Sequence, residues 1–344
     1  MRHARLVPAA AGLLLCLASA CMAAAQELPR VRLVATGGTI SNRTGGRLTA
    51  DELVGLAPDV RRYARPEAEQ FSNTASSDLT LGQWLALSRR LNGLLSSDAT
   101  LAGIVVTSGT DTLEELAYFL HLTVRDARPV VVVGSMRNPS TAGYEGAANL
   151  VEGFRVAASP DARGQGVLVV LNDEINSARE VTKTDALRLQ TFQSRTTGVL
   201  GVVDPDRVVF YRGAVKRHTA ASEFDVAAIA ELPRVDVVLV YQDASGDLIK
   251  AAADLGARGI VVAAAGAGAT SGTQSDGLRY AIGKGVTVVV TTRTGSGRIP
   301  GTRMSGARYI GGEDLAPIKA RILLMLALAT TGDPGVIQRM FLEY

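Results

Sequence analysis

A regular alternation of short apolar segments with amphipathic segments is the feature of this sequence that most restricts its fold. Apolar runs rich in β-branched residues occur at residues 101–106, 130–133 and 167–171, and segments with helical spacing at residues 112–124 and 143–158 separate them. Continuous apolar strands between helices are typical of a parallel sheet that helices cover on both faces. The pattern therefore predicts an α/β fold.

The alternation starts again near residue 235, after a polar stretch. Three further apolar strands with intervening helices are expected there, followed by two C-terminal helices at residues 316–329 and 334–342. The 344 residues leave room for two domains. We predict an N-terminal domain with a larger, mostly parallel sheet and flanking helices at residues 26–211, a linker at 212–234, and a smaller C-terminal domain with a parallel sheet at 235–344.

The first 25 residues have the pattern of a secretory signal peptide. Arg2 and Arg5 precede an apolar run at residues 7–20, and small residues favour cleavage after Ala25. In one alternative Cys21 becomes a lipidated first residue, and in another the apolar run stays as an uncleaved anchor, for which it is short. The pattern predicts a periplasmic or secreted protein, with lipid anchoring through Cys21 as the alternative.

Composition argues against several classes of function. Both cysteines, Cys16 and Cys21, lie in this leader, so a mature chain would have no thiol for disulfides, catalysis or metal binding. The three histidines, His3, His121 and His218, are not spaced for a metal ion. The formal net charge of +3 falls to +1 without the leader arginines, which gives no electrostatic basis for nucleic-acid binding. We expect no metal, no cofactor, no nucleic acid and, after cleavage, no membrane association.

The first motif that suggests chemistry is the turn after an apolar strand at residues 31–35. Gly37 and Gly38 accept backbone angles that other residues resist, and they let a ligand approach the main chain. Ligands of α/β sheets collect beyond the carboxyl ends of strands, so the Thr39 hydroxyl is placed where substrates bind. A hydroxyl can attack a carbonyl carbon if a base accepts its proton and N–H groups stabilise the oxyanion. The alternative is an ordinary turn in which the threonines cap backbone groups.

A second apolar strand runs into Ser108-Gly109-Thr110-Asp111-Thr112 and then into a helix. In an ordinary helix start, Thr110 or Asp111 would cap the helix and Glu114 would complete a capping box. This hydroxyl-and-glycine turn repeats the first motif, however, and parallel strands place both turns at the same edge of one sheet. We therefore interpret it as a second part of one site.

A lysine in a threonine-rich stretch, Val181-Thr182-Lys183-Thr184, is the third candidate. Such a lysine is commonly solvated at the surface. Beside a hydroxyl and a carboxylate in a partly dry site, it can instead accept a proton. Thr110, Lys183 and Asp111 would then act as hydroxyl, base and orienting acid, which is the logic of a catalytic triad without histidine.

Together the motifs Thr36-Gly37-Gly38-Thr39-Ile40, Ser108-Gly109-Thr110-Asp111-Thr112 and Val181-Thr182-Lys183-Thr184 resemble those of the bacterial L-asparaginase and glutaminase-asparaginase family. With the leader, the chain looks most like the exported, type II branch. The resemblance extends over nearly the whole mature chain. It implies hydrolysis of the side-chain amide of L-asparagine to L-aspartate and ammonia through a threonine acyl-enzyme, with glutaminase side activity.

The resemblance also implies roles for single residues. Thr39 matches the family's nucleophile, whereas Thr110, Asp111 and Lys183 match its second triad, in which Asp111 also receives the substrate's α-amino group. Ser76 matches the serine that binds the α-carboxylate, and Ser77 stands where exported members usually carry Gln or Glu. The implied assembly is a homotetramer of intimate dimers, and the implied substrate-binding residues are Ser76, Ser77, Gly38, Gly109 and Asp111.

One departure from the family's pattern concerns the segment after Thr39. Family members carry a tyrosine there that polarises the threonine hydroxyl, but residues 41–47 contain none, and the nearest aligned residue is Arg43. Deprotonation of Thr39 would then depend on Lys183, on another loop residue, or on a tyrosine from elsewhere. The candidate tyrosines are Tyr144 and Tyr309.

Two further departures concern residues that the family takes from a partner chain. Ala267 stands at the position of an asparagine, and no acid appears before Glu313 where a glutamate is expected. Contact to the substrate ammonium would be weaker, or Thr270, Ser271 or Arg293 would make it. Two other interpretations therefore stay open, an amino-acid-binding protein with lost or weak turnover and an amidase for a different amide.

Overall fold

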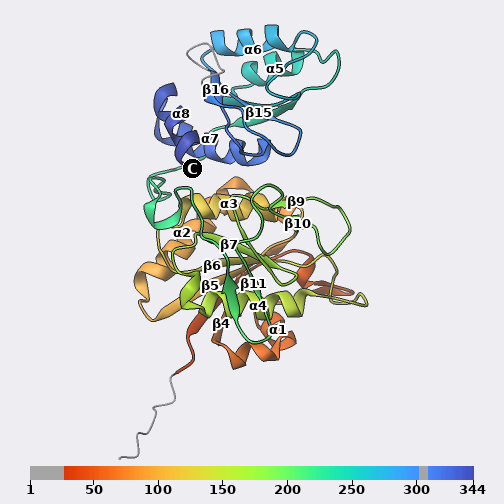
Figure 1. Ribbon diagram of the computed structural model, residues 1–344, viewed down its shortest axis with the longest axis vertical. Helices are drawn as coiled ribbons and strands as arrows, with labels where there is room; N and C mark the ends of the chain where they lie inside the picture. The colour runs from red at the N-terminus through yellow and green to blue at the C-terminus, as the bar shows by residue number, and fades with distance from the viewer. Residues whose placement is uncertain (1–26, 302–308) are drawn as a thin grey trace, which may run out of the picture.

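The computed structural model describes residues 27–301 and 309–344, which form two α/β parts (Figure 1). The larger part contains the strands up to residue 210, and the smaller part contains those from residue 235 on. Among the described residues, η5 (Thr219–Ala221) is the only regular element between them. The predicted leader, with Cys16 and Cys21, lies outside the described residues.

An eight-stranded sheet forms the centre of the larger part. Five neighbouring strands run parallel, and three more join at one end through antiparallel pairing. The mostly parallel sheet confirms the predicted fold class. In sheet order the strands are β12 (Val208–Phe210), β11 (Gly201–Val203), β8 (Glu174–Ser177), β7 (Val167–Leu171), β6 (Val130–Val133), β5 (Leu101–Thr107), β1 (Arg30–Gly37) and β4 (Arg65–Thr74).

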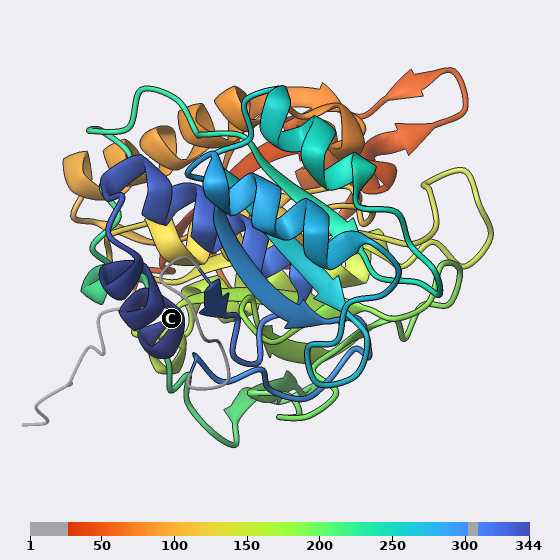
Figure 2. The same ribbon diagram turned by 90° about the horizontal axis from the view of Figure 1, so that it is seen from above.

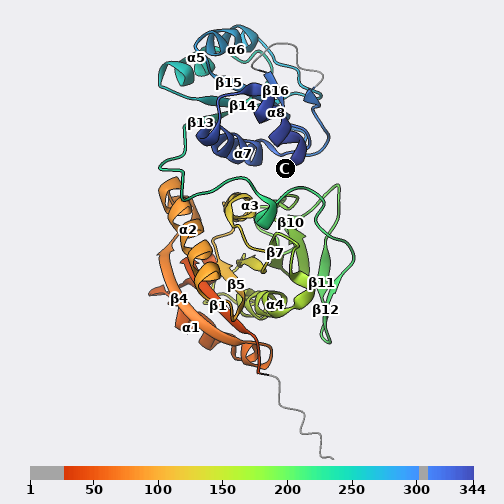
Figure 3. The same ribbon diagram turned by 90° about the vertical axis from the view of Figure 1, so that its left-hand side faces the viewer.

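Helices cover both faces of this sheet, because its central strands are apolar on both sides (Figure 3). Alternate residues of β5 show the division. Val105 packs in a cluster with α1 (Ala50–Leu56) and α4 (Gly146–Ala158). Ile104 and Val106 pack in a second cluster with α2 (Leu81–Ser97) and α3 (Leu113–Thr123).

The smaller part contains an all-parallel sheet, as predicted, but with four strands where three were expected, because β16 was not predicted. One pair of helices covers its outer face, and another pair lies between this sheet and the larger part (Figures 1 and 3). The strands are β13 (Val235–Leu239), β14 (Gly259–Ala264), β15 (Thr287–Thr292) and β16 (Tyr309–Gly311), the outer helices are α5 (Asp247–Asp254) and α6 (Gln274–Gly283), and the inner helices are α7 (Pro317–Thr330) and α8 (Pro334–Glu343).

The two parts share buried surface along α7. This helix is apolar almost all round, and its residues belong to the same buried cluster as α2 and α3 of the larger part. Arg179 adds polar contacts across the boundary. Its guanidinium makes two hydrogen bonds to Asp314, at 2.8 and 2.7 Å, and its Nε donates to the Tyr344 carbonyl at 2.6 Å. The burial of α7 between the two parts follows from its sequence, because a helix that is hydrophobic on nearly all sides must be covered on nearly all sides.

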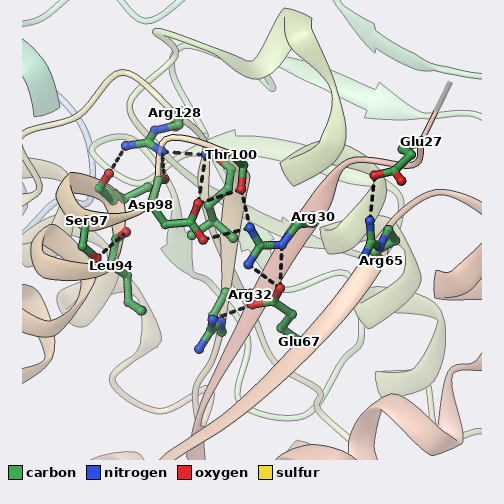
Figure 4. Close-up of polar contacts among 12 residues, drawn as sticks. Glu27, Arg30, Arg32, Arg65, Glu67, Leu94, Ser97, Asp98, Thr100 and Arg128 are labelled. Atoms are coloured by element: carbon green, nitrogen blue, oxygen red, sulfur yellow. Dashed lines mark hydrogen bonds and ion pairs between the residues drawn. The ribbon is translucent and has the colours of Figure 1, made fainter.

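Strand β4 is the main element that the alternation did not predict. Its ten residues, RPEAEQFSNT, are largely polar and lie at the edge of the sheet, where none is fully buried. Ion pairs at the amino ends of the strands accompany it (Figure 4): Glu67 pairs with Arg30 and Arg32, and Asp98 pairs with Arg30 at 3.0 Å. An edge strand needs no continuous apolar sequence, so periodicity alone does not reveal it.

Two short two-stranded pairs lie outside the large sheet. β2 (Asn42–Arg43) pairs with β3 (Gly46–Arg47), and β9 (Thr182–Lys183) pairs with β10 (Phe192–Gln193). Within the described ranges, no helix has the length and apolar character needed to cross a membrane.

Candidate active site

The carboxyl ends of three neighbouring parallel strands bring two of the predicted motifs together. β1 lies between β4 and β5, with Ala35 paired to Thr107 and Gly37 paired to Thr74. Thr39 therefore follows the central strand of the three. Ser76 follows β4, and Thr110 follows β5. This edge is opposite to the ion pairs of Figure 4, which lie at the strands' amino ends.

Close backbone packing at this edge requires the glycines. Gly37 and Gly38 have φ values of 105° and 88°, a region that L side chains rarely adopt. A Cβ atom on Gly38 would overlap the Gly109 backbone, and one on Gly109 would lie 2.7 Å from Ser76 Oγ. The residues before Thr39 and Thr110 thus touch each other, and Ser76 touches the second of them. Ser76 is buried, whereas the adjacent Ser77 is exposed.

Lys183 reaches the second motif directly. Its Nζ donates to Thr110 Oγ1 at 3.0 Å and lies 2.9 Å from Asp111 Oδ1. The Lys183 side chain is only 15% exposed, whereas that of Asp111 is 78% exposed. Lys183 is therefore not a solvated surface lysine. The carboxylate beside it stays open to a ligand in solution.

The alternative interpretation of residues 108–114 as an ordinary capping motif is wrong. The N-cap of α3 is Thr112, and its side chain makes no capping hydrogen bond. Glu114 completes no capping box either. Its Oε1 accepts hydrogen bonds from Thr182 Oγ1 and from the Lys183 backbone N–H, both at 3.1 Å.

Sequence reasoning missed Glu114 as a residue that supports the site. Its position near the start of a helix gave it an obvious local explanation. Only the approach of residues 182–183, nearly seventy positions later, shows what its carboxylate binds. A glutamate that is buried, 6% exposed, needs such partners.

Thr39 begins the short helical turn η1 (Thr39–Ser41) and is partly exposed. Both of its chain neighbours accept hydrogen bonds from side chains. Arg47 Nη1 donates to the Gly38 carbonyl at 3.3 Å, and the Tyr144 hydroxyl donates to the Ile40 carbonyl at 2.9 Å. The turn that holds Thr39 is thus braced from two sides.

The two tyrosines considered as substitutes for the family's tyrosine lie in different places. Tyr144 is adjacent to the turn, but its hydroxyl proton is directed at Ile40, and burial raises its pKa above the usual value. Tyr309 lies in β16 and packs against the core of the smaller part. Of the two, Tyr144 is the one that this chain brings to the Thr39 turn.

The segment after Thr39 forms the β2–β3 hairpin, which projects from the edge of the molecule (Figure 2, red-orange). Arg43, at the position nearest the family's tyrosine, pairs with Glu52 at 3.0 Å. The hairpin also meets residues 138–144, where Thr44 N–H donates to Ser140 Oγ at 2.8 Å. Arg43 is therefore held by α1.

The positions that depart from the family in the second domain lie around β14 and β16. Ala267 lies in the turn closed by the Ala265–Ala269 bridge. Glu313 is buried and accepts from the Gly301 N–H at 3.3 Å, with Arg298 Nε at 3.2 Å. Both of these partners belong to the same domain as Glu313.

Two of the three proposed substitutes for these residues have local partners. The Thr270 hydroxyl bonds to Ser275 at 2.7 Å, and the Ser271 hydroxyl accepts from the Asp243 N–H at 2.9 Å. In residues 27–301 and 309–344, no group of three or more His, Cys, Asp or Glu side chains is arranged to hold a metal ion.

Comparison with known proteins agrees with this geometry. The family described as "Asparaginase, N-terminal" matches residues 30–216, and "Glutaminase/Asparaginase C-terminal domain" matches residues 234–341. L-asparaginase 2 of Bacillus subtilis is 41% identical, covering 93% of this chain and 88% of its own. Glutaminase-asparaginase of Pseudomonas fluorescens is 36% identical, covering 98% of each.

Among solved structures, that of the probable cytoplasmic L-asparaginase from Campylobacter jejuni superposes with a TM-score of 0.87. It is 39% identical, and the match covers 92% of this chain and all of that one. The similarity therefore extends over both α/β parts.

Proposed function

The chain belongs to the asparaginase family, and from this premise we propose that it hydrolyses the side-chain amide of L-asparagine to L-aspartate and ammonia. The observation that carries the proposal is the contact of Lys183 Nζ with both the Thr110 hydroxyl and the Asp111 carboxylate. Close packing of Gly38 on Gly109 supports a position of Thr39 near this group. A nucleophile, a proton acceptor and an orienting acid are what an acyl transfer requires.

The reaction divides into two steps. The Thr39 hydroxyl oxygen attacks the amide carbon, and its proton passes to the Thr110–Lys183 pair. The same pair then donates a proton to the leaving nitrogen, which departs as ammonia. Water then cleaves the acyl-threonine, which restores the hydroxyl and releases L-aspartate. Backbone N–H groups at the glycine turns stabilise the developing oxyanion in both steps.

Substrate recognition uses the open side of the same edge. The Asp111 carboxylate receives the α-ammonium group, and the Ser76 hydroxyl with nearby backbone N–H groups receives the α-carboxylate. Ser77 is short and exposed, so it leaves room at a position where a longer side chain would reach the ligand. L-asparagine is the expected main substrate, and L-glutamine a poorer one. Glutaminase-asparaginases among the relatives support the second activity.

Ammonia release from L-asparagine, with Thr39→Ala as the control, tests the proposal. The intact protein should release ammonia, and the variant should lose more than about 99% of kcat while still binding L-asparagine. Binding without ammonia release by the intact protein would favour an amino-acid-binding protein. The absence of a tyrosine in residues 41–47 is the observation that motivates this second candidate. Turnover of other amides alone would indicate an amidase for a different substrate.

Export and assembly are part of the proposal. We infer that residues 1–25 direct export and that the mature chain forms a homotetramer of intimate dimers. A relative in Haemophilus influenzae is named as periplasmic, whereas the C. jejuni protein is named as cytoplasmic. Cell fractionation with mass determination of the mature N-terminus distinguishes cleavage after Ala25 from lipidation at Cys21. Light scattering gives the oligomeric state.

A further inference from the structure

A buried lysine of the second domain holds the segment that carries Lys183. Lys319 lies in the first turn of α7 and is 2% exposed. Its Nζ donates to the carbonyls of Ala178 and Arg179, each at 3.0 Å, and also to the carbonyl of Val181. One ammonium group thus takes three acceptors from four successive residues. α7 faces the larger part in Figures 1 and 3, so the contact crosses the domain boundary.

Glu114 holds the next two residues of the same segment from the first domain. Its Oε1 accepts from the Thr182 hydroxyl and from the Lys183 N–H. Burial lowers the pKa of Lys319 to about 8, and the electrostatic attraction of Glu114 opposes this shift. A buried cation and a buried carboxylate therefore fix the backbone from residue 178 to residue 183. The ammonium group of Lys319 donates to the carbonyls of the segment, and the carboxylate of Glu114 accepts from its hydroxyl and N–H groups.

The position of Lys183 Nζ depends on this backbone. The Lys183 Nζ donates to Thr110 and contacts Asp111 at hydrogen-bond distances. A displacement of a reacting group by about 1 Å lowers the reaction rate on the order of a hundredfold. A solvent-exposed segment would be held less firmly, because water competes for its backbone hydrogen-bonding groups. The second domain therefore contacts, through Lys319, the backbone segment that positions Lys183 of the same chain.

We propose that Lys319 is a positioning residue for Lys183, through which α7 of the second domain sets the geometry of the amide-cleaving site. This inference rests on the proposed function, since it assigns Lys319 a role in the same reaction. A purely structural role is the competing explanation, because Arg179 already joins the domains through Asp314 and Tyr344. A structural tie would alter stability without acting through Lys183.

A double-mutant cycle distinguishes the two. Lys319→Met and Lys183→Met are made singly and together, and kcat and KM for L-asparagine are measured well below each variant's melting temperature. We expect Lys319→Met to lower kcat at least about tenfold with KM within about threefold, and to have no further effect in the Lys183→Met background. An equal fold-decrease in kcat when Lys319→Met is added to the unaltered protein and to Lys183→Met would overturn the positioning role. An unchanged kcat for Lys319→Met alone would overturn it too.

A matched control lies two residues along the same helix. Arg321 is partly buried, donates to the Val235 carbonyl at 2.9 Å and attracts Glu115 of α3 electrostatically, so it is a cation of the same helix that also faces the first domain. Arg321→Met should keep kcat within about twofold, whatever its effect on melting temperature. If Lys319→Met does not fold, Lys319→Gln replaces it, because it keeps N–H donors without the charge, and the same cycle applies.

The outcome also separates this inference from the proposed function. An unchanged kcat in Lys183→Met would contradict the catalytic role of Lys183 itself. A large loss in Lys183→Met with full activity in Lys319→Met would leave that role intact and overturn only the positioning by α7.

Discussion

At the scale of single residues, Thr110 has the most specific surroundings in the candidate site. Its hydroxyl is buried and accepts from Lys183 Nζ, although 73 positions separate the two residues in the chain. The same ammonium group contacts Asp111, which is open to solvent. Hydroxyl, amine and carboxylate therefore form one continuous polar group beside the Thr39 turn.

Removal of the Thr110 hydroxyl should reduce turnover strongly. Thr110→Val keeps the side-chain shape but takes away the acceptor of Lys183, so kcat should fall about 10²- to 10⁴-fold. Thr110→Ser should recover most of the activity. Thr112→Val is the matched control, since the Thr112 side chain makes no capping bond. Ammonia release measures all three, and a Thr110→Val enzyme near full activity would contradict the role given to this hydroxyl.

Gly37 and Gly38 were expected to adopt unusual backbone angles and to let a ligand approach the main chain. The structure gives both a positive φ, and it packs Gly38 on the Gly109 backbone, which the sequence did not predict. Glu114 and Lys319 were not identified, because nothing near either residue in sequence shows which carbonyls or N–H groups it will meet. Their roles depend on contacts across 69 and about 140 positions.

At the scale of elements, β4 shows how a polar sequence becomes part of a sheet. It pairs in parallel with β1 from Arg65 to Gln70 and again at Thr74, and Glu67 on it pairs with Arg30 and Arg32 of β1. Side-chain charge thus replaces apolar burial at this edge. The alternation of apolar residues, which predicted the central strands, has no counterpart here.

Loss of the Glu67 charge should affect stability and leave catalysis unchanged. Glu67 is partly exposed, so Glu67→Gln should lower the free energy of unfolding by about 1 kcal/mol or less. The ion pairs lie at the amino ends of the strands (Figure 4), whereas the Thr39 turn follows the carboxyl end of β1. Urea unfolding should show the small loss and ammonia release an unchanged kcat. A clear fall in kcat would show that β4 transmits strain to the site.

Helix α3 should make the fold sensitive to mild acid through His121. His121 is buried, accepts from the Val167 N–H at 3.1 Å and packs against His218. Burial lowers its pKa well below the usual value, and the nearby His218, Arg179 and Lys319 lower it further. The unfolded chain therefore binds a proton more readily, and stability falls as pH drops below about 6.5.

His121→Gln tests this, because glutamine keeps an acceptor for the Val167 N–H without titrating. Its melting temperature should decrease less between pH 7.5 and pH 5.0 than that of the unaltered protein, even if it starts lower. His218, partly buried with a lowered pKa, contributes in the same direction and remains in both proteins. Equal decreases in the two proteins would remove His121 from the explanation.

At the scale of the whole molecule, the two α/β parts are joined by α7 and by Arg179. α7 shares an apolar cluster with α2 and α3. Arg179 is almost buried, whereas its partner Asp314 is 44% exposed. The guanidinium lowers the pKa of Asp314 to about 2. The pair therefore contributes its full stability above about pH 4, and this contribution is lost as pH falls toward 2.

Asp314→Asn should weaken the joint between the parts. It leaves a buried guanidinium without its carboxylate, and because Asp314 is partly exposed we expect a loss of about 1–3 kcal/mol in the free energy of unfolding. Calorimetry should show a lower or broader transition at pH 7, with a smaller difference from the unaltered protein near pH 2. Identical transitions at pH 7 would show that α7 packing alone joins the parts.

The order of the apolar strands and of the helices between them followed from the sequence by itself. Apolar, β-branched runs between amphipathic segments determine two parallel-sheet domains, because their only way to bury both faces is under helices. The glycine turns after β1 and β5 were likewise readable, since positive φ at Gly37 and Gly38 and close approach at Gly109 restrict residue type locally.

Tertiary structure alone decided which charges meet. Lys183 becomes a partly buried neighbour of Thr110 because β9 pairs with β10, because Glu114 takes its N–H, and because Lys319 takes the carbonyls before it. None of these contacts has a local signal. Buried polar groups must find partners wherever the fold brings them, and those partners here come from distant segments and from both domains.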